Sequence, residues 1–121
     1  MGEEYNFEIS FYEDLDKRDS NDVRVMEILA QLYTKVGRNA EGLSMDLRLS
    51  KARPEDPMIH YNLSCSLALM GQLGEAVEVL MSAIEMGYSD FDWMMQDKDL
   101  DPIRSHPAYK ELLNEIGREP S

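Results

Sequence analysis

Apolar residues recur at helical spacing through the middle of the chain. Between residues 23 and 37, Val25, Leu29 and Leu32 lie three or four positions apart, and Gly37 follows the last of them. This spacing predicts an amphipathic helix, because residues three and four apart share one helical face, and glycine commonly follows a helix end. A second stretch of the same kind begins near residue 40 and stops before Pro54, which cannot continue a helix.

The alternation of apolar faces and short breaks continues to the end of the chain. The breaks in the middle contain only a few residues, so consecutive helices should form antiparallel hairpins. The predicted helices account for most of the chain, and no sheet is expected. The predicted helices cover residues 5–18, 22–36, 40–53, 57–70, 74–87, 90–96 and 106–116.

The two central hairpins align with each other without a gap. Shifting the chain by 34 residues places Leu29 on Leu63 and Gly37 on Gly71. The same shift superimposes three aspartates in front of predicted helices, namely Asp22, Asp56 and Asp90. A period of this length predicts a helical-repeat array, in which each unit buries its apolar face only against its neighbours.

The repeated positions resemble the tetratricopeptide repeat (TPR). In residues 57–90 the matching positions hold Leu63, Ser64, Leu67, Ala76, Leu80 and Ala83. In residues 23–56 they hold Met26, Leu29, Ala30, Tyr33 and Pro54, with departures at Gly42 and Asp46. The resemblance implies an all-α fold, a right-handed stack of antiparallel helical hairpins.

The resemblance also implies a single domain built from four parts. Residues 1–22 form an N-terminal packing helix, 23–56 and 57–90 are full repeats, and 91–121 are a degenerate repeat with a capping helix. About three such units are needed for a stable array. The predicted parts meet that requirement.

In TPR proteins the first helix of each hairpin lines the concave surface, which places the candidate binding residues. In the first repeat they are Arg24, Glu27, Gln31, Thr34 and Lys35. In the second they are Met58, Tyr61, Asn62, Cys65, Ala68 and Leu69. Some TPR domains hold a C-terminal carboxylate with Lys, Asn and Arg, but only Asn62 matches here, so that partner class is not expected.

The apolar character of the predicted helix 57–70 has three explanations. Residues 57–74 contain no Asp, Glu, Lys or Arg, and a helix that is apolar nearly all round is buried or keeps one face for a partner. The stripe of Met58, Tyr61, Cys65, Ala68 and Leu69 would bind a ligand with Tyr61 as its anchor, be covered by Trp93 or the last helix, or mediate self-association.

Charge narrows the class of partner. The chain has 24 acidic and 12 basic residues and a formal net charge of −12. Nucleic acids and anionic membranes are therefore not expected partners, because both would repel it. Eight acidic and two basic residues fall within residues 1–22, which favours a protein or peptide partner with a basic or apolar segment. The start of the chain lacks the pattern of a secretory signal, so a cytoplasmic protein is expected.

Candidate catalytic and metal-binding residues are few. Cys65 and His60 are five positions apart, on different faces of a helix, so they cannot form a nucleophile and base pair, and Cys65 is expected to be inert. Residues 97–102 alternate acids, but Pro102 and Ala108 stand where a calcium loop needs Gly and Glu. A solvated turn capped by Asp101 is expected there, and no metal or cofactor.

These observations favour a noncatalytic protein-interaction module or adaptor over an enzyme. It would bind a peptide or protein segment on the concave surface of the repeats. The alternative is a small regulatory or enzymatic protein that uses an apolar pocket around Tyr61 and Cys65.

Overall fold

The structure, a computed structural model, describes the backbone of residues 2–118 and the side chains of residues 4–118. All of its regular elements are helices: η1 (Gly2–Tyr5), α1 (Asn6–Arg18), α2 (Val23–Lys35), α3 (Asn39–Ala52), α4 (Pro57–Leu69), α5 (Leu73–Glu85), α6 (Phe91–Gln96), η2 (Lys98–Ile103) and α7 (Pro107–Glu115). Residues 2–118 contain no strand, which confirms the all-α prediction. The seven predicted helices agree with α1 to α7 within two residues at each end.

The three aligned aspartates begin three helices. The side chain of Asp22 accepts a hydrogen bond from the backbone N–H of Arg24, and Asp56 accepts from Met58. Asp90 accepts from Trp93 in the same way. Each carboxylate therefore satisfies an N–H group that has no partner within the helix. The aspartates recur because each hairpin needs the same start signal.

Glycine ends the first helix of each hairpin. Gly37 and Gly71 have φ angles of 80° and 78°, in the left-handed region that a residue without Cβ adopts at no steric cost. This geometry lets the N–H of Arg38 reach the carbonyl of Tyr33 at 2.8 Å. Gln72 reaches Leu67 in the same way at 2.9 Å. Two free carbonyls are thereby satisfied where the chain reverses.

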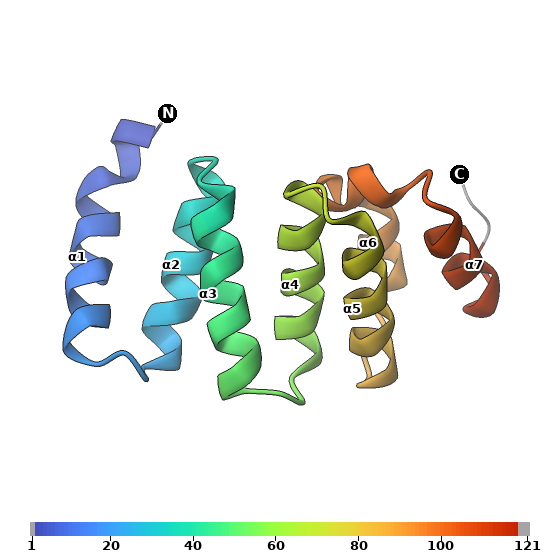
Figure 1. Ribbon diagram of the computed structural model, residues 1–121, viewed down its shortest axis with the longest axis horizontal. Helices are drawn as coiled ribbons and strands as arrows, with labels where there is room; N and C mark the ends of the chain where they lie inside the picture. The colour runs from blue at the N-terminus through green and yellow to red at the C-terminus, as the bar shows by residue number, and fades with distance from the viewer. Residues whose placement is uncertain (1, 119–121) are drawn as a thin grey trace. The chain divides into compact units, whose positions relative to one another are not determined.

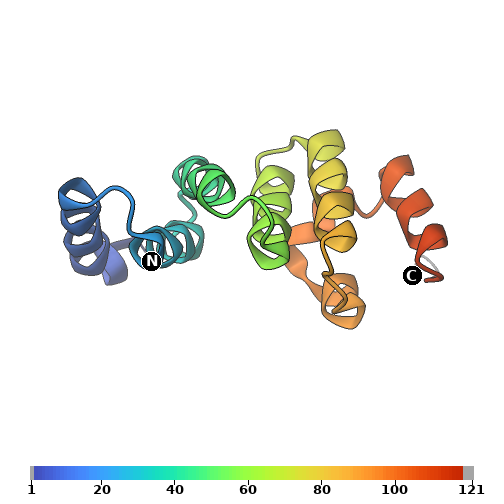
Figure 2. The ribbon, with the colours of Figure 1, turned by 90° about the horizontal axis from the view of Figure 1, so that it is seen from below.

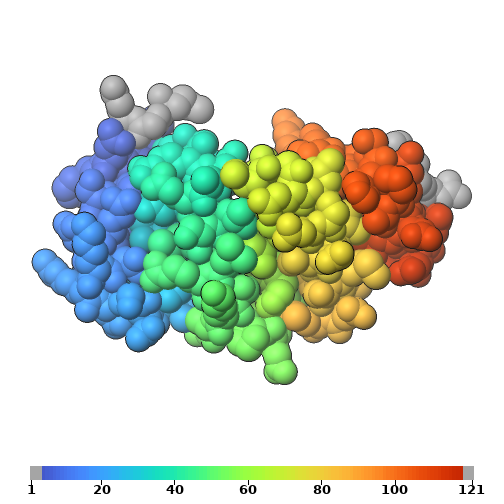
Figure 3. All heavy atoms as spheres, in the orientation of Figure 1, coloured from blue at the N-terminus to red at the C-terminus, as the bar shows by residue number. Residues whose placement is uncertain are grey.

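The chain divides into two compact units, residues 1–55 and 56–121. In unit 1, α2 packs against both α1 and α3 (Figures 1 and 2). In unit 2, α4 packs against α5 and η2, and α5 also contacts α7; side chains of α4 and α5 meet in the space-filling view (Figure 3). The boundary falls next to the predicted repeat boundary at residues 56 and 57.

Small residues let the helices of each hairpin approach closely. A Cβ built on Gly42 would lie 3.1 Å from Thr34 Oγ1 across the α2 and α3 interface. The equivalent pair in unit 2 is Ala76 and Ala68, both buried. Unit 1 pairs a larger residue, Thr34, with Gly42, where unit 2 pairs Ala68 with Ala76. The two pairs fill a similar volume between the helices, so Thr34 compensates for the departure from the TPR pattern at Gly42.

The prediction of a solvated turn at residues 97–102 is wrong. Asp97, not Asp101, caps η2 by accepting a hydrogen bond from Asp99 N, and Asp97 itself is buried. Leu100 and Ile103 are fully buried. Residues three apart lie on one side of a 3₁₀ helix, so the two apolar side chains face the core together. The acids on either side of Leu100 conceal this in the sequence.

Candidate protein-interaction surfaces

The polar face of α2 is accessible in unit 1, as the sequence predicts. Arg24, Glu27, Gln31 and Lys35 are exposed and Thr34 is half-buried. They follow one another at spacings that keep them on one side of the helix. The opposite side of α2 is core, with Val25, Met26, Leu29, Ala30, Leu32 and Tyr33 buried. These five polar residues are called the α2 face below.

Local contacts give the α2 face one cation near each end and an acid between them. Arg24 Nε lies 3.7 Å from Asp22 Oδ1, which leaves the guanidinium largely in solvent. Lys35 Nζ lies 5.5 Å from the centre of the Tyr5 ring. Thr34 Oγ1 donates to the carbonyl of Ala30 at 3.0 Å. The face is therefore polar along its length, with a cation near each end.

The equivalent face of α4 is largely closed, so the predicted open stripe is wrong at Tyr61, Cys65 and Ala68. Tyr61 is 2% exposed, and Cys65 and Ala68 are buried too. The Tyr61 ring stacks on Tyr88 with centroids 4.3 Å apart and an angle of 11° between the planes. The Tyr61 hydroxyl donates to Asp97 Oδ2 at 2.7 Å.

The cover over α4 comes from Tyr88 and η2. Neither Trp93, which is 52% exposed, nor the last helix supplies the stack and hydrogen bond that hold Tyr61. Of the predicted α4 residues, Met58 and Asn62 remain exposed and Leu69 is half-buried. Only the margin of the stripe is thus accessible.

The closed region also fixes the chemistry of Cys65. Its Sγ lies 3.7 Å from Asp97 Oδ2, and burial, reinforced by the negative charge of Asp97, raises the pKa of the thiol well above its usual range. Burial likewise raises the pKa of Tyr61 strongly and that of Tyr88 to about 12. A thiol held in its neutral form is a poor nucleophile. The open pocket that the enzymatic alternative needs at Tyr61 and Cys65 is filled by protein.

His60 lies apart from this group. Its Nδ1 is 2.9 Å from the backbone oxygen of Asp56, one turn earlier in α4. Because the thiol contacts Asp97 instead, the helix presents the two side chains to different surroundings. The sequence prediction that they lie on different faces agrees with these contacts.

A hollow of about 550 Å³ opens on unit 1 between the ends of α1 and α3. Its lining residues are Asp16, Lys17, Ser20, Asn21, Met26, Arg48, Lys51 and Ala52. The Arg48 guanidinium donates to both Asp16 oxygens, at 2.9 and 2.8 Å, and to the Ser20 carbonyl at 2.9 Å. These hydrogen bonds engage the Arg48 donors and tie α1 to α3 at the hollow.

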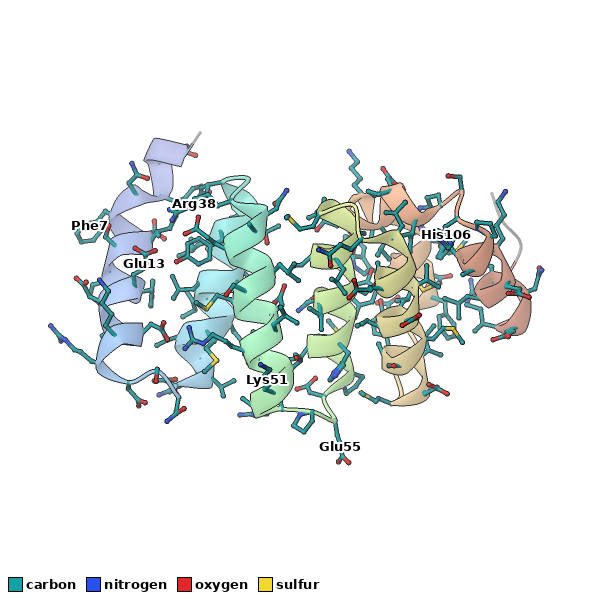
Figure 4. All side chains as sticks on the ribbon, viewed as in Figure 1. Phe7, Glu13, Arg38, Lys51, Glu55 and His106 are labelled. Atoms are coloured by element: carbon teal, nitrogen blue, oxygen red, sulfur yellow. The ribbon has the colours of Figure 1, made fainter. Side chains whose placement is uncertain are left out.

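An aromatic pair on α1 was not identified from the sequence. Phe7 is 80% and Phe11 50% exposed, and their ring centroids lie 6.5 Å apart. Phe11 also meets the Tyr12 ring edge to face at 5.1 Å. Figure 4 shows Phe7 on the side of α1 that faces away from α2. The spacing of four residues between Phe7 and Phe11, on a different side from buried Ile9, is the signal that could have revealed it.

Comparison with family models found no match. A curated chloroplastic protein of Arabidopsis thaliana is 27% identical over 113 residues. The alignment covers 90% of this chain and 34% of that protein, so the chain spans about a third of the relative's length. The chain is therefore similar to one part of this plant protein.

Two further properties of the described residues bear on the candidate surfaces. Within residues 4–118, no group of three or more His, Cys, Asp or Glu side chains is placed to hold a metal ion. None of the helices that the structure describes is long and apolar enough to cross a bilayer. The accessible candidate surfaces include the α2 face and the aromatic pair on α1.

Proposed function

We propose that the chain is a noncatalytic protein-interaction module of the TPR kind that binds a protein or peptide segment along the α2 face. The observation that carries this proposal is the exposed polar face of α2, whose opposite side is buried in the core of unit 1. The aspartate caps, the glycine ends and the paired helices within each unit support the TPR assignment. The buried free thiol of Cys65 fits a reducing compartment, and we place the module in the cytoplasm.

The charges on the α2 face define the peptide that it fits. Arg24 and Lys35 are separated by eleven positions, which corresponds to about 16 Å along a helix. An extended peptide spans that length with about five residues. We therefore expect acidic groups about five residues apart, with a basic or amide side chain between them for Glu27. The α2 face thus selects by local charge, independently of the net charge of the chain.

Peptide selection on the intact chain tests the proposal. Random peptides displayed on phage would be selected for binding to the full protein. Changes in the amide chemical shifts of the protein would then map where the selected peptides bind. We expect shifts along α2 and a loss of at least about tenfold in affinity for the double variant Arg24→Glu, Lys35→Glu, because both end contacts become repulsive. Lys51→Glu, an exposed lysine on α3, is the matched control and should change little. The proposal would be refuted if the selected peptides bound the double variant as tightly as the unchanged protein.

A further inference from the structure

Phe7 and Phe11 form an exposed aromatic ridge on α1, called the α1 ridge. Single exposed apolar residues are common on protein surfaces and need no explanation. Two phenylalanines one helical turn apart, with stacked rings and the exposures given above, instead form one continuous apolar surface. The opposite side of α1 carries Ile9 into the core of unit 1, so α1 is apolar on two sides. The second apolar side is exposed in unit 1.

The charge around the α1 ridge differs from that on the inner side of the same helix. On the inner side, Glu13 (Figure 4) accepts a hydrogen bond from Tyr33, and Asp16 forms an ion pair with Arg48. Near the ridge, Glu4, Glu8 and Asp14 are exposed, and none of the three takes part in an ion pair within residues 4–118. These three acids are therefore not neutralised by an ion pair, and the cations of α1, Lys17 and Arg18, lie in its last turn.

We propose that the α1 ridge docks an amphipathic helix of a partner protein, with apolar residues three or four apart and Lys or Arg on either side of them. The apolar residues would pack on Phe7 and Phe11 as one helix packs on another, with the axes about 8–10 Å apart. The flanking cations would meet Glu4, Glu8 and Asp14. This surface lies on a different helix from the α2 face and does not depend on the proposed function.

Charge favours such a partner over a second copy of the chain. Two copies would bring together surfaces of the same negative sign, and each chain carries a net charge of −12. A contact between two short helices also buries less than the roughly 1,200 Å² typical of stable interfaces. A cationic helix is attracted at long range and needs only the local contact to bind transiently.

The test uses two synthetic helical peptides and the full chain. One peptide carries leucines on one face and lysines on its flanks; the other has the same leucines and glutamates in place of the lysines. Amide chemical shifts in residues 7–14 should respond to the lysine peptide and not to the glutamate peptide. The affinity should fall at least about tenfold in the double variant Phe7→Ser, Phe11→Ser, whose helical content is checked by circular dichroism.

Matched charge variants separate docking from general attraction to an acidic protein. Glu8→Lys beside the ridge should weaken binding of the lysine peptide several-fold, whereas Glu78→Lys at an exposed position of α5 should not. The double variant Arg24→Glu, Lys35→Glu should leave binding of the lysine peptide intact. Failure of the α1 ridge proposal can therefore be distinguished from failure of the α2 proposal. Equal binding to the phenylalanine double variant would overturn the inference. So would a dimer in sedimentation that Phe7→Ser, Phe11→Ser dissolves, because the occupant would then be a second copy.

Discussion

Helices α2 and α4 each begin a hairpin and lie 34 residues apart in the sequence, yet their equivalent faces differ in exposure. Glu27 and Gln31 are exposed on α2, whereas the equivalent Tyr61 and Cys65 are buried on α4. The backbone is the same in kind, with an aspartate at the start and a glycine after the end. The difference lies in Tyr88, Asp97 and η2, which pack over this face of α4. An apolar face on the first helix of a hairpin can thus be covered by another part of the same chain, and is not by itself a sign of a ligand.

The two units also build one type of hydrogen bond in different surroundings. In unit 1 the Tyr33 hydroxyl donates to Glu13, whose side chain is 35% exposed and lies 3.7 Å from Arg38. In unit 2 the Tyr61 hydroxyl donates to buried Asp97, which also accepts from Asp99 N. Loss of a partner costs more in the second case, because a buried group cannot turn to water instead.

The largest expected effect is the loss of the Tyr61 side chain. Tyr61→Ala removes a buried ring, its stack on Tyr88 and the donor to Asp97, so the free energy of unfolding should fall by about 3–5 kcal/mol. Glu27→Ala, the equivalent position in α2, should change it by less than about 0.5 kcal/mol. Urea unfolding followed by circular dichroism measures both. Similar losses in the two variants would mean that the two faces do not differ.

Removing part of the cover should expose the face beneath it. Leu100→Ala deletes a fully buried side chain of η2 and should cost about 2–5 kcal/mol. Because η2 packs on α4, the same variant should make Cys65 react faster with a thiol reagent under native conditions. Ser105→Ala, an exposed site just beyond η2, is the control. An unchanged rate would show that η2 does not shield the thiol.

Overpacking a hairpin interface should have a smaller effect. Ala76 is fully buried, and the Ser64 hydroxyl donates to its carbonyl at 2.7 Å. Ala76→Leu forces extra volume between α4 and α5 and should destabilise by about 1–3 kcal/mol. The melting temperature reports this, and Glu75→Leu on the exposed side of α5 should leave it nearly unchanged. A wild-type melting temperature in Ala76→Leu would argue against close contact at that point.

Alkaline pH should weaken unit 2 through Tyr61 and Cys65. The pKa values of both groups are raised by burial, so the unfolded chain releases these protons at lower pH than the folded chain. Stability should therefore be constant below about pH 9, the ordinary thiol pKa, and fall above it. Urea unfolding between neutral pH and pH 10.5 measures the slope. Cys65→Ser should move the onset of the loss of stability to higher pH. A free energy of unfolding that does not change with pH over this range would contradict the burial of both groups.

The smallest effect concerns the exchange of volume between Thr34 and Gly42. Gly42→Ala places a methyl group 3.1 Å from Thr34 Oγ1, which offsets the gain in helix propensity. The double variant Thr34→Ala, Gly42→Ala reproduces the pair found at Ala68 and Ala76. It should be more stable than the sum of its single changes by about 0.5 kcal/mol or more. Strict additivity in a double-mutant cycle would show that the two residues do not share space.

The sequence predicted the helices well because their signals are local. Apolar spacing acts within one or two turns, and so do the aspartates before α2, α4 and α6 and the glycines after α2, α4, α5 and α7. The α2 face followed from the same periodicity and from the resemblance to TPR proteins. The closure of α4 could not be predicted in this way, because Asp97 lies 36 residues from Tyr61 and approaches it only through the tertiary fold. The acids around Leu100 made η2 look like a surface turn.

The burial of Cys65 has a practical consequence for spectroscopy. Since the native thiol is shielded and remains protonated, a cysteine introduced on the surface can be labelled with maleimide dyes while Cys65 is kept. Ser44 in unit 1 and Glu78 in unit 2 are exposed and suit such substitutions. A donor and acceptor pair at these two sites would record, molecule by molecule, the distance between the units as a ligand is added.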